Sequence, residues 1–244
     1  MSLRPKIRLF VDHPLQEGER VALSREQANY LFNVMRLREG AEVALFNGTA
    51  GEWRAEVASA GKRGGALDCQ AQVAGQVTPP DLWLLFAPIK KARTHFIVEK
   101  AVELGVRRIV PVQTAFTNAE RIRQDRLQAH AVEAAEQCGA VFVPELADLR
   151  PLAKVLDGWD TRSILFADEA LASASSSLSA VVADVTAPAA ILIGPEGGFS
   201  EAERTRLSGM DCVTPMALGP RILRADTAAV AALTLWQTYA GDWT

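Results

Sequence analysis

Two short apolar stretches near the C-terminus, each followed by a glycine-containing turn and a helical pattern, constrain the fold of this chain most strongly. The first stretch, Ala189–Ile193, is apolar without alternation, which is typical of a strand buried on both faces of a parallel sheet. It leads into residues 194–199, where three glycines allow positive φ angles and a close approach of the backbone to a ligand. Residues 200–203 then match a capping box that begins a helix. Open α/β sheets bind ligands at such strand-turn-helix junctions.

The second stretch, residues 213–218, is followed by a loop and an alanine-rich helical pattern that runs through Trp236. Asp226 or Thr227 is placed to cap this helix. Arg221 and Arg224 flank two apolar residues in the loop, a combination that is more typical of ligand binding than of a simple connection. Two such turns after neighbouring strands would lie side by side at one edge of the sheet.

The first turn excludes two common ligand classes. Its spacing matches neither the phosphate-binding G-x-x-x-x-G-K-[ST] loop nor the dinucleotide fingerprint G-x-G-x-x-G. The Glu196 carboxylate would repel a phosphate and suits hydroxyl groups or a cation. On this turn alone, a glycine-rich reversal of the chain that binds nothing is an equally good interpretation.

The two turns, residues 193–199 and 218–224, closely resemble the signature loops of the RsmE-type methyltransferases of the SPOUT superfamily. The resemblance extends to residues 90–93, 99–106 and 133–139 and covers nearly the whole chain. Members of this family use S-adenosyl-L-methionine to methylate N3 of a uridine in 16S ribosomal RNA. The resemblance implies an α/β fold, in which a small PUA-like β-barrel domain precedes a SPOUT-type parallel sheet with a C-terminal trefoil knot.

The resemblance also implies roles for individual residues. Methyl transfer to an imide nitrogen builds negative charge on the uracil oxygens, and Arg224 is the first candidate to stabilise that charge, with Arg221 as the second. Asp226 is a candidate base, although its position favours a helix cap. The residues expected to hold the cofactor are Phe166, Ala167, Ile193, Gly194, Pro195, Glu196, Gly197, Gly198, Leu218, Gly219, Ile222, Leu223, Arg224 and Thr227.

At two positions the chain departs from the family pattern. Ala140 stands where an arginine is usual, which removes a side chain that could contact RNA or a partner. Asp226 stands where a glutamate is usual, so the charge is kept but its reach is shorter.

The first 75 residues predict a small β-barrel with one helix. A capping-box pattern at residues 24–27 begins the helix, and Leu31, Val34 and Met35 are expected on its buried face. Strand-like segments follow, and the Asn47-Gly48 pair marks a hairpin between two of them. These segments span residues 42–47, 52–57 and 66–73, and a further turn is expected at residues 61–65.

The basic residues of this part permit two interpretations. Arg4, Lys6, Arg8, Arg36 and Arg38 could form one basic face, whereas their spacing alone favours scattered, solvated charges. The resemblance to RNA-binding PUA modules favours RNA contact. The residues expected to bind RNA are Arg4, Arg8, Arg36, Lys90, Lys91 and Arg93. A net charge of −3 argues against a broad electrostatic footprint for nucleic acid, so any contact must be local.

Beyond Pro79 and Pro80, the most linker-like point of the chain, strands alternate with helices. We therefore expect two domains, residues 1–75 and 81–244, and a parallel sheet in the second. The expected strands are residues 82–87, 108–113, 141–143 and 163–167, and the expected helices are residues 92–104, ended by Gly105, and 126–138, ended by Gly139.

Other features limit the function classes. Three widely spaced cysteines and three histidines give no disulfide framework and no metal-ligand spacing, so we expect no metal. Neither a signal-peptide pattern nor a membrane-spanning stretch is visible, which predicts a cytoplasmic protein that does not bind membranes.

The partners implied are 16S ribosomal RNA or the small ribosomal subunit, and a second copy of the chain, because SPOUT enzymes resemble one another in forming homodimers. Val230, Leu233 and Trp236 lie at helical spacing and could pack against that copy or inside the chain. Two further hypotheses remain open. The chain could methylate another RNA or a ribose 2′-hydroxyl, or it could be a non-catalytic RNA-binding assembly factor.

Overall fold

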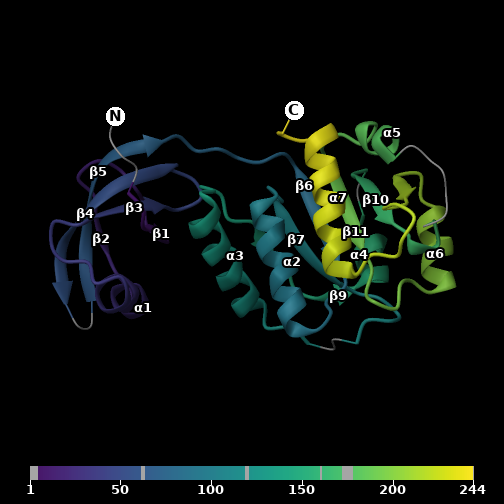
Figure 1. Cartoon of the computed structure of the whole chain (residues 1–244), viewed down its shortest axis with the longest axis horizontal. Coiled ribbons are helices and arrows are strands. Elements are labelled where there is room, and N and C mark those ends of the chain that lie inside the picture. The colour runs from purple at the N-terminus through teal and green to yellow at the C-terminus, as the bar shows by residue number, and fades with distance from the viewer. Residues whose placement is uncertain (1–4, 62–63, 119–120, 160, 172–177, 244) are drawn as a thin grey trace. The chain divides into compact units, whose positions relative to one another are not determined.

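The computed structural model describes residues 5–61, 64–118, 121–159, 161–171 and 178–243. The chain forms two compact units (Figure 1). The N-terminal unit comprises residues 1–78 and 135–143, and the C-terminal unit comprises residues 79–134 and 144–244.

The N-terminal unit is built on a five-stranded sheet with the order β1-β3-β4-β5-β2. Its strands are β1 (Arg8–Phe10), β2 (Arg20–Ala22), β3 (Glu42–Phe46), β4 (Glu52–Gly61) and β5 (Gly64–Ala74). β1 pairs with β3 in parallel and the other pairs are antiparallel. The predicted hairpin is confirmed, and the Asn47 side chain accepts hydrogen bonds from the backbone of Thr49 and Ala50 in its loop. Two residues of the predicted turn at 61–65 lie outside the described residues.

The helix of this unit differs from the prediction. The capping box at Ser24 is confirmed, but α1 (Arg25–Ala28) continues as a π-helical segment, η1 (Asn29–Val34). Leu31 is buried, whereas Val34 and Met35 are 60% and 39% exposed. The prediction is wrong for these two residues because the wider π-helical turn, with Met35 N–H donating to the Tyr30 carbonyl, takes them off the buried face.

Arg8 is not part of a basic surface, and this prediction is wrong. Its Nε lies 2.6 Å from Glu52, and the two side chains are 8% and 0% exposed. The guanidinium also donates to the backbone carbonyls of Ala135, Glu136 and Ala140 and lies over the Phe46 ring. A buried charge is stable only when it is paired and hydrogen-bonded, and these partners meet that need. Ala140 accepts its hydrogen bond from Arg8 through the backbone carbonyl, so this contact does not require the arginine side chain that is usual at this position in the family.

The C-terminal unit contains the predicted parallel sheet. Its main order is β12-β10-β11-β6-β7-β8, β9 pairs with β7, and every pair is parallel. The strands are β6 (Leu82–Phe86), β7 (Arg108–Gln113), β8 (Glu145–Leu146), β9 (Arg150–Pro151), β10 (Ser163–Ala167), β11 (Ala189–Ile193) and β12 (Val213–Met216). The strand predicted at residues 141–143 is wrong. Those residues are irregular and β8 begins only after Pro144, which has no N–H for a strand ladder.

Helices cover both faces of this sheet (Figure 1). They are α2 (Lys91–Glu103), α3 (Gln124–Cys138), α4 (Leu152–Asp157), α5 (Leu178–Ala183), α6 (Glu201–Ser208) and α7 (Ala225–Tyr239). α2 and α7 lie side by side. α4 and α6 belong to a separate apolar core with residues of the strands, including Leu85, Phe166 and Leu192. The described helices include none that is long and apolar enough to cross a membrane.

The last helix is anchored inside its own unit. Leu233 and Trp236 are both 0% exposed, and Trp236 Nε1 donates to the Val185 carbonyl at 2.7 Å. The helical spacing allowed these residues to pack either against a second copy or inside the chain. For Leu233 and Trp236, the structure shows burial inside the chain. Gln237 is also buried, and its amide donates to the Leu104 carbonyl at the end of α2.

Replacing Arg8 with methionine should destabilise the N-terminal unit, because the change removes the guanidinium that pairs with the buried Glu52 carboxylate. We expect Arg8→Met to lower the free energy of unfolding by about 3–5 kcal/mol, measured by urea unfolding followed by circular dichroism. Arg20→Met is the matched control, since Arg20 pairs with Asp68 but its side chain is 67% exposed, so its loss should be small. Equal losses in the two variants would contradict the structural role of Arg8.

Candidate functional site

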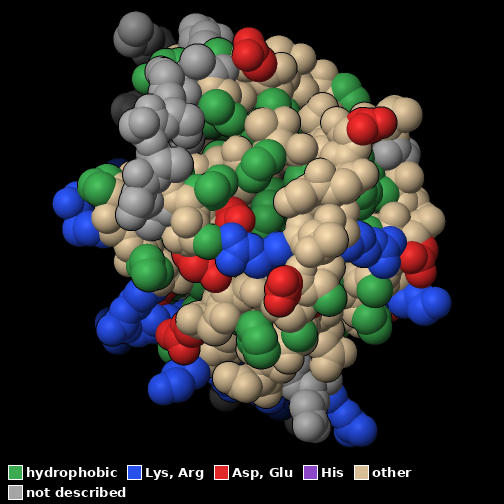
Figure 2. Space-filling model, turned by 90° about the vertical axis from the view of Figure 1, so that its right-hand side faces the viewer, with side chains coloured by type: hydrophobic (Ala, Val, Ile, Leu, Met, Phe, Trp, Pro, Cys, Tyr) green, Lys and Arg blue, Asp and Glu red, His purple; other side chains and the backbone are tan. Residues whose placement is uncertain are grey.

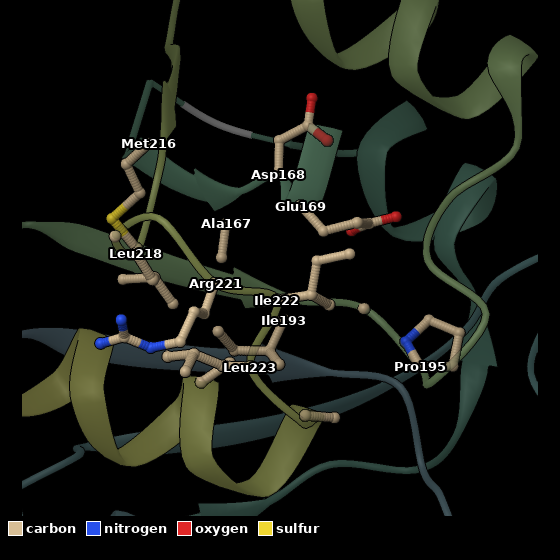
Figure 3. A pocket seen from close by; sticks show the side chains of 14 residues that line it. Ala167, Asp168, Glu169, Ile193, Pro195, Met216, Leu218, Arg221, Ile222 and Leu223 are labelled. Atoms are coloured by element: carbon tan, nitrogen blue, oxygen red, sulfur yellow. The ribbon is translucent and has the colours of Figure 1, made fainter. Parts of the chain in front are cut away.

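The carboxyl ends of three neighbouring strands define the candidate site. β10 lies between β11 and β12 and pairs with both in parallel, so the chain leaves all three strands at one edge of the sheet. A hollow of about 480 Å³, open solvent included, lies at this edge (Figure 3). Its lining residues are Ala167, Asp168, Glu169, Ile193, Gly194, Pro195, Met216, Leu218, Gly219, Arg221, Ile222, Leu223, Ala225 and Ala228.

The turn after β11 is shaped by packing inside the turn. A Cβ atom on Gly194 would lie 2.5 Å from the Phe199 ring, and Gly198 has a φ of +68°. Phe199 in turn packs edge-on against Phe166 with ring centroids 4.9 Å apart. The predicted capping box at Ser200 begins α6. The glycines are therefore needed to form this turn, and Gly194 is the one that also lines the hollow.

The loop after β12 lines the hollow together with the turn after β11, and it ends at the start of α7. Arg224 occupies the N-cap position of α7 without a side-chain cap, so the prediction that Asp226 or Thr227 caps this helix is wrong. Asp226 instead lies in the first turn, where its carboxylate accepts a hydrogen bond from Thr227 N–H at 2.9 Å. A negative charge is favourable there because it faces the positive end of the helix dipole.

Arg93, which we expected to contact RNA, connects the two loops of the site. Its Nη1 lies 3.0 Å from Glu196 Oε1, and its Nε lies 3.7 Å from Asp226 Oδ2. Arg93 stands in the first turn of α2, so one side chain of a third element fixes both loops. Because Glu196 faces Arg93 and does not line the hollow, its carboxylate contributes to loop geometry in this structure.

Two acidic residues of the lining, Asp168 and Glu169, follow β10 directly. The family resemblance implies that the loop at residues 166–168 lies around the cofactor, whereas Glu169 was absent from the expected contacts. The edge-of-sheet argument that identified the two glycine turns could have found Glu169 as well. Asp168 pairs with Arg204 at 2.7 Å and thereby holds α6. In the part of the chain that the structure describes, Glu169 has no ion pair. Figure 3 shows both acidic side chains on one side of the hollow and Arg221 on the other.

The structure brings together about half of the expected site. Ala167, Ile193, Gly194, Pro195, Leu218, Gly219, Arg221, Ile222 and Leu223 line the hollow, whereas Phe166, Glu196, Gly197, Gly198, Arg224, Asp226 and Thr227 do not. Phe166 is 1% exposed and belongs to the core beneath the hollow. Arg224 is exposed at the start of α7.

Among the described residues, the remaining basic residues expected to bind RNA do not belong to the lining of the hollow. Lys90 and Lys91 are exposed at the start of α2, and Arg36 is exposed with a positive φ of 59°. Arg4 lies outside the described residues. On the face drawn in Figure 2, the blue and red side chains are interspersed and do not gather into one broad patch of positive charge.

The chemistry of the lining limits what the hollow can bind. Ile193, Leu218, Ile222 and Leu223 offer an apolar surface, and Ile222 is 74% exposed, so a ligand could cover it. Backbone groups of the two turns and the Glu169 carboxylate add polar contacts, which suits a ligand with an apolar ring and hydroxyl or cationic groups. Among the described residues, no cluster of three His, Cys, Asp or Glu side chains could hold a metal ion.

Comparisons with known proteins identify the family of the chain. A model of the RNA methyltransferase domain matches residues 77–237, and a model of the RNA methyltransferase PUA domain matches residues 23–66. Ribosomal RNA small subunit methyltransferase E of Rickettsia conorii is 29% identical over 93% of both chains. Solved structures of two methyltransferases with bound S-adenosylmethionine, from Neisseria gonorrhoeae and Legionella pneumophila, each have a TM-score of 0.84. The Neisseria structure is 26% identical and the Legionella structure 28% identical to this chain. Each alignment covers 98% of this chain, together with 99% of the Neisseria chain and 100% of the Legionella chain.

The family model spans more than half of the chain, and the similarity to the relatives extends over both units. The chain therefore belongs to the RNA methyltransferase family of the RsmE type, with a PUA domain followed by a SPOUT-type, S-adenosylmethionine-dependent methyltransferase domain.

Proposed function

We propose that this protein transfers the methyl group of S-adenosylmethionine to N3 of a uridine in the 16S ribosomal RNA of the small subunit. The observation that carries this proposal is the hollow at the ends of β10, β11 and β12, which both signature loops line. The Rickettsia conorii relative is named for methylation of small-subunit ribosomal RNA, which supports the substrate class.

The residues of the hollow fit the cofactor. Ile193, Leu218, Ile222 and Leu223 would provide the apolar surface for the adenine ring, and the backbone of the two turns would bind its polar edge. Glu169 is the carboxylate best placed to accept hydrogen bonds from ribose hydroxyl groups or to face the cationic sulfonium. When bound, S-adenosylmethionine supplies an electrophilic methyl carbon.

The remaining chemistry falls to the chain itself. The N3 proton of uridine must leave before or during attack, and negative charge then spreads over O2 and O4. Arg224, exposed at the start of α7, is our candidate to stabilise that charge, and Arg221 in the lining is the second. Asp226 is held by Arg93 next to these residues and is the candidate base.

The RNA must present an unpaired or flipped uridine, because a duplex hides N3 in the base pair. We propose that residues 1–75 form a PUA-like barrel that binds RNA through Arg36, and that Lys90 and Lys91 extend this contact in a methyltransferase domain of residues 81–244. Arg4 stays part of this proposal, whereas Arg8 is excluded by its burial.

Two further features of the proposal concern the fold of the C-terminal segment and the assembly of the protein. The C-terminal segment forms a trefoil knot, which is consistent with the placement of β10 between β11 and β12. The protein acts as a homodimer in the cytoplasm, where small subunits are assembled.

Identification of the modified nucleoside tests the proposed reaction. Purified protein is incubated with labelled S-adenosylmethionine and unmodified small subunits, and the digested RNA is analysed by mass spectrometry. We expect 3-methyluridine. A 2′-O-methylated nucleoside or another base would overturn the target. No product, with an active control enzyme on the same subunits, would favour a non-catalytic assembly factor.

The two arginines should differ in kinetic behaviour. Arg224→Ala should lower kcat about 100-fold with little change in cofactor affinity, because its guanidinium acts on charge that develops in the transition state. Arg221→Ala should mainly weaken cofactor binding, because Arg221 lines the hollow. Lys154→Ala, on the exposed surface of α4, is the control. A folded Arg224→Ala enzyme that methylates at the wild-type rate would exclude the role of Arg224.

A further inference from the structure

A second pocket lies between the first turns of α2 and α3. Its volume is about 770 Å³, open solvent included, and it shares no lining residue with the hollow at the strand ends. Lys91 and His95 contribute to it from α2, Arg121 and Arg123 from the segment before α3, and Arg126 from α3, over an apolar floor that includes Leu127. We call it the basic pocket.

The charge of the basic pocket is unbalanced. Its lining contains no Asp or Glu. Arg123 is held by Asp125 at 2.6 Å, whereas within the described residues Lys91, Arg121 and Arg126 have no ion pair. Cations that share a cavity repel one another, so this arrangement is most stable when an anion occupies it. Both helices add to this preference because their positive dipole ends lie at the pocket.

The pKa of His95 should respond to an anion that binds in the pocket. Its ring lies on that of His130, with centroids 4.1 Å apart, and His130 contacts Glu133 at 3.1 Å. Burial, followed by the nearby charges of His130, Lys91 and Arg126, lowers the pKa of His95 below its ordinary value, and Glu133 offsets this only in part. An anion in the pocket would favour the protonated ring, so binding and proton uptake are linked.

The first turn of α2 connects this pocket with the cofactor site. Lys91 faces the basic pocket, while Arg93, two residues later, contacts Glu196 and Asp226 of the two cofactor loops. A phosphate bound at Lys91 would therefore be held by the same helical turn that fixes those loops. That is a suitable place to anchor the backbone of a nucleic acid whose base enters the site.

We propose that the basic pocket binds a phosphate group, and that in the working enzyme this is a backbone phosphate of the substrate RNA. The second half of this proposal rests on the proposed function, because it requires an RNA substrate. The alternative source is free phosphate or a small phosphate-bearing molecule, and two measurements separate the cases.

The first measurement tests the pocket without RNA or activity. The imidazole resonances of His95 and His130 are followed by NMR over pH, with and without inorganic phosphate. We expect phosphate to raise the pKa of His95, and the effect to vanish in Lys91→Gln/Arg126→Gln but not in Lys154→Gln, a control from the surface of α4. No response of His95 in the wild-type protein would overturn the pocket as a phosphate site.

The second measurement is binding to transcribed 16S ribosomal RNA over a range of KCl concentrations. The double variant should bind about 10-fold more weakly, and the slope of log affinity against log salt should fall by about 0.7 for each RNA phosphate that the variant no longer neutralises. Lys154→Gln should bind as the wild type does. An unchanged slope with an intact phosphate response would assign the pocket to a free phosphate compound and overturn the RNA half. Neither measurement needs methylation, so failure of the proposed reaction would be seen separately.

Discussion

The parallel pairing of β10 with both β11 and β12 is the constraint on which the site depends. It brings the ends of three strands to one edge, and the loops that follow them can meet only there. The loops are then held by local interactions: Phe199 packs on Phe166 in the first, and the start of α7 fixes the second. Arg93 joins them by contacting Glu196 and Asp226. Backbone pairing thus places the site, and one guanidinium bridges its two loops.

The chain uses several arginines internally although its relatives act on RNA. Arg8 is enclosed by Glu52 and three carbonyls, and Arg93 is held by two carboxylates. The positive charge available to a polyanion is correspondingly local, which fits a net charge of −3. A basic residue in an acidic protein of this kind can be assigned to RNA only after its internal partners are known.

Local patterns in the sequence predicted the regular elements well. The apolar run of β11 and the capping boxes at Ser24 and Ser200 depend on neighbouring residues alone, and the structure confirms them. Interactions between distant residues were not predictable from such patterns. The burial of Arg8 depends on Glu52 and the end of α3, and the ion pairs of Arg93 depend on loops about 100 and 130 residues away. Glu169 was missed because no glycine motif marks its loop, although it follows a strand of the same edge.

The central claim is that the hollow at the ends of β10, β11 and β12 holds S-adenosylmethionine. Isothermal titration tests it most directly, with wild type, Ile222→Asp and Val34→Asp. Both substitutions put a charge at an exposed apolar residue, 74% and 60% exposed respectively, but only Ile222 lines the hollow. We predict one cofactor per chain, with affinity lowered about 10-fold or more by Ile222→Asp through loss of apolar burial and unchanged in Val34→Asp. Equal affinity in all three proteins would contradict the account.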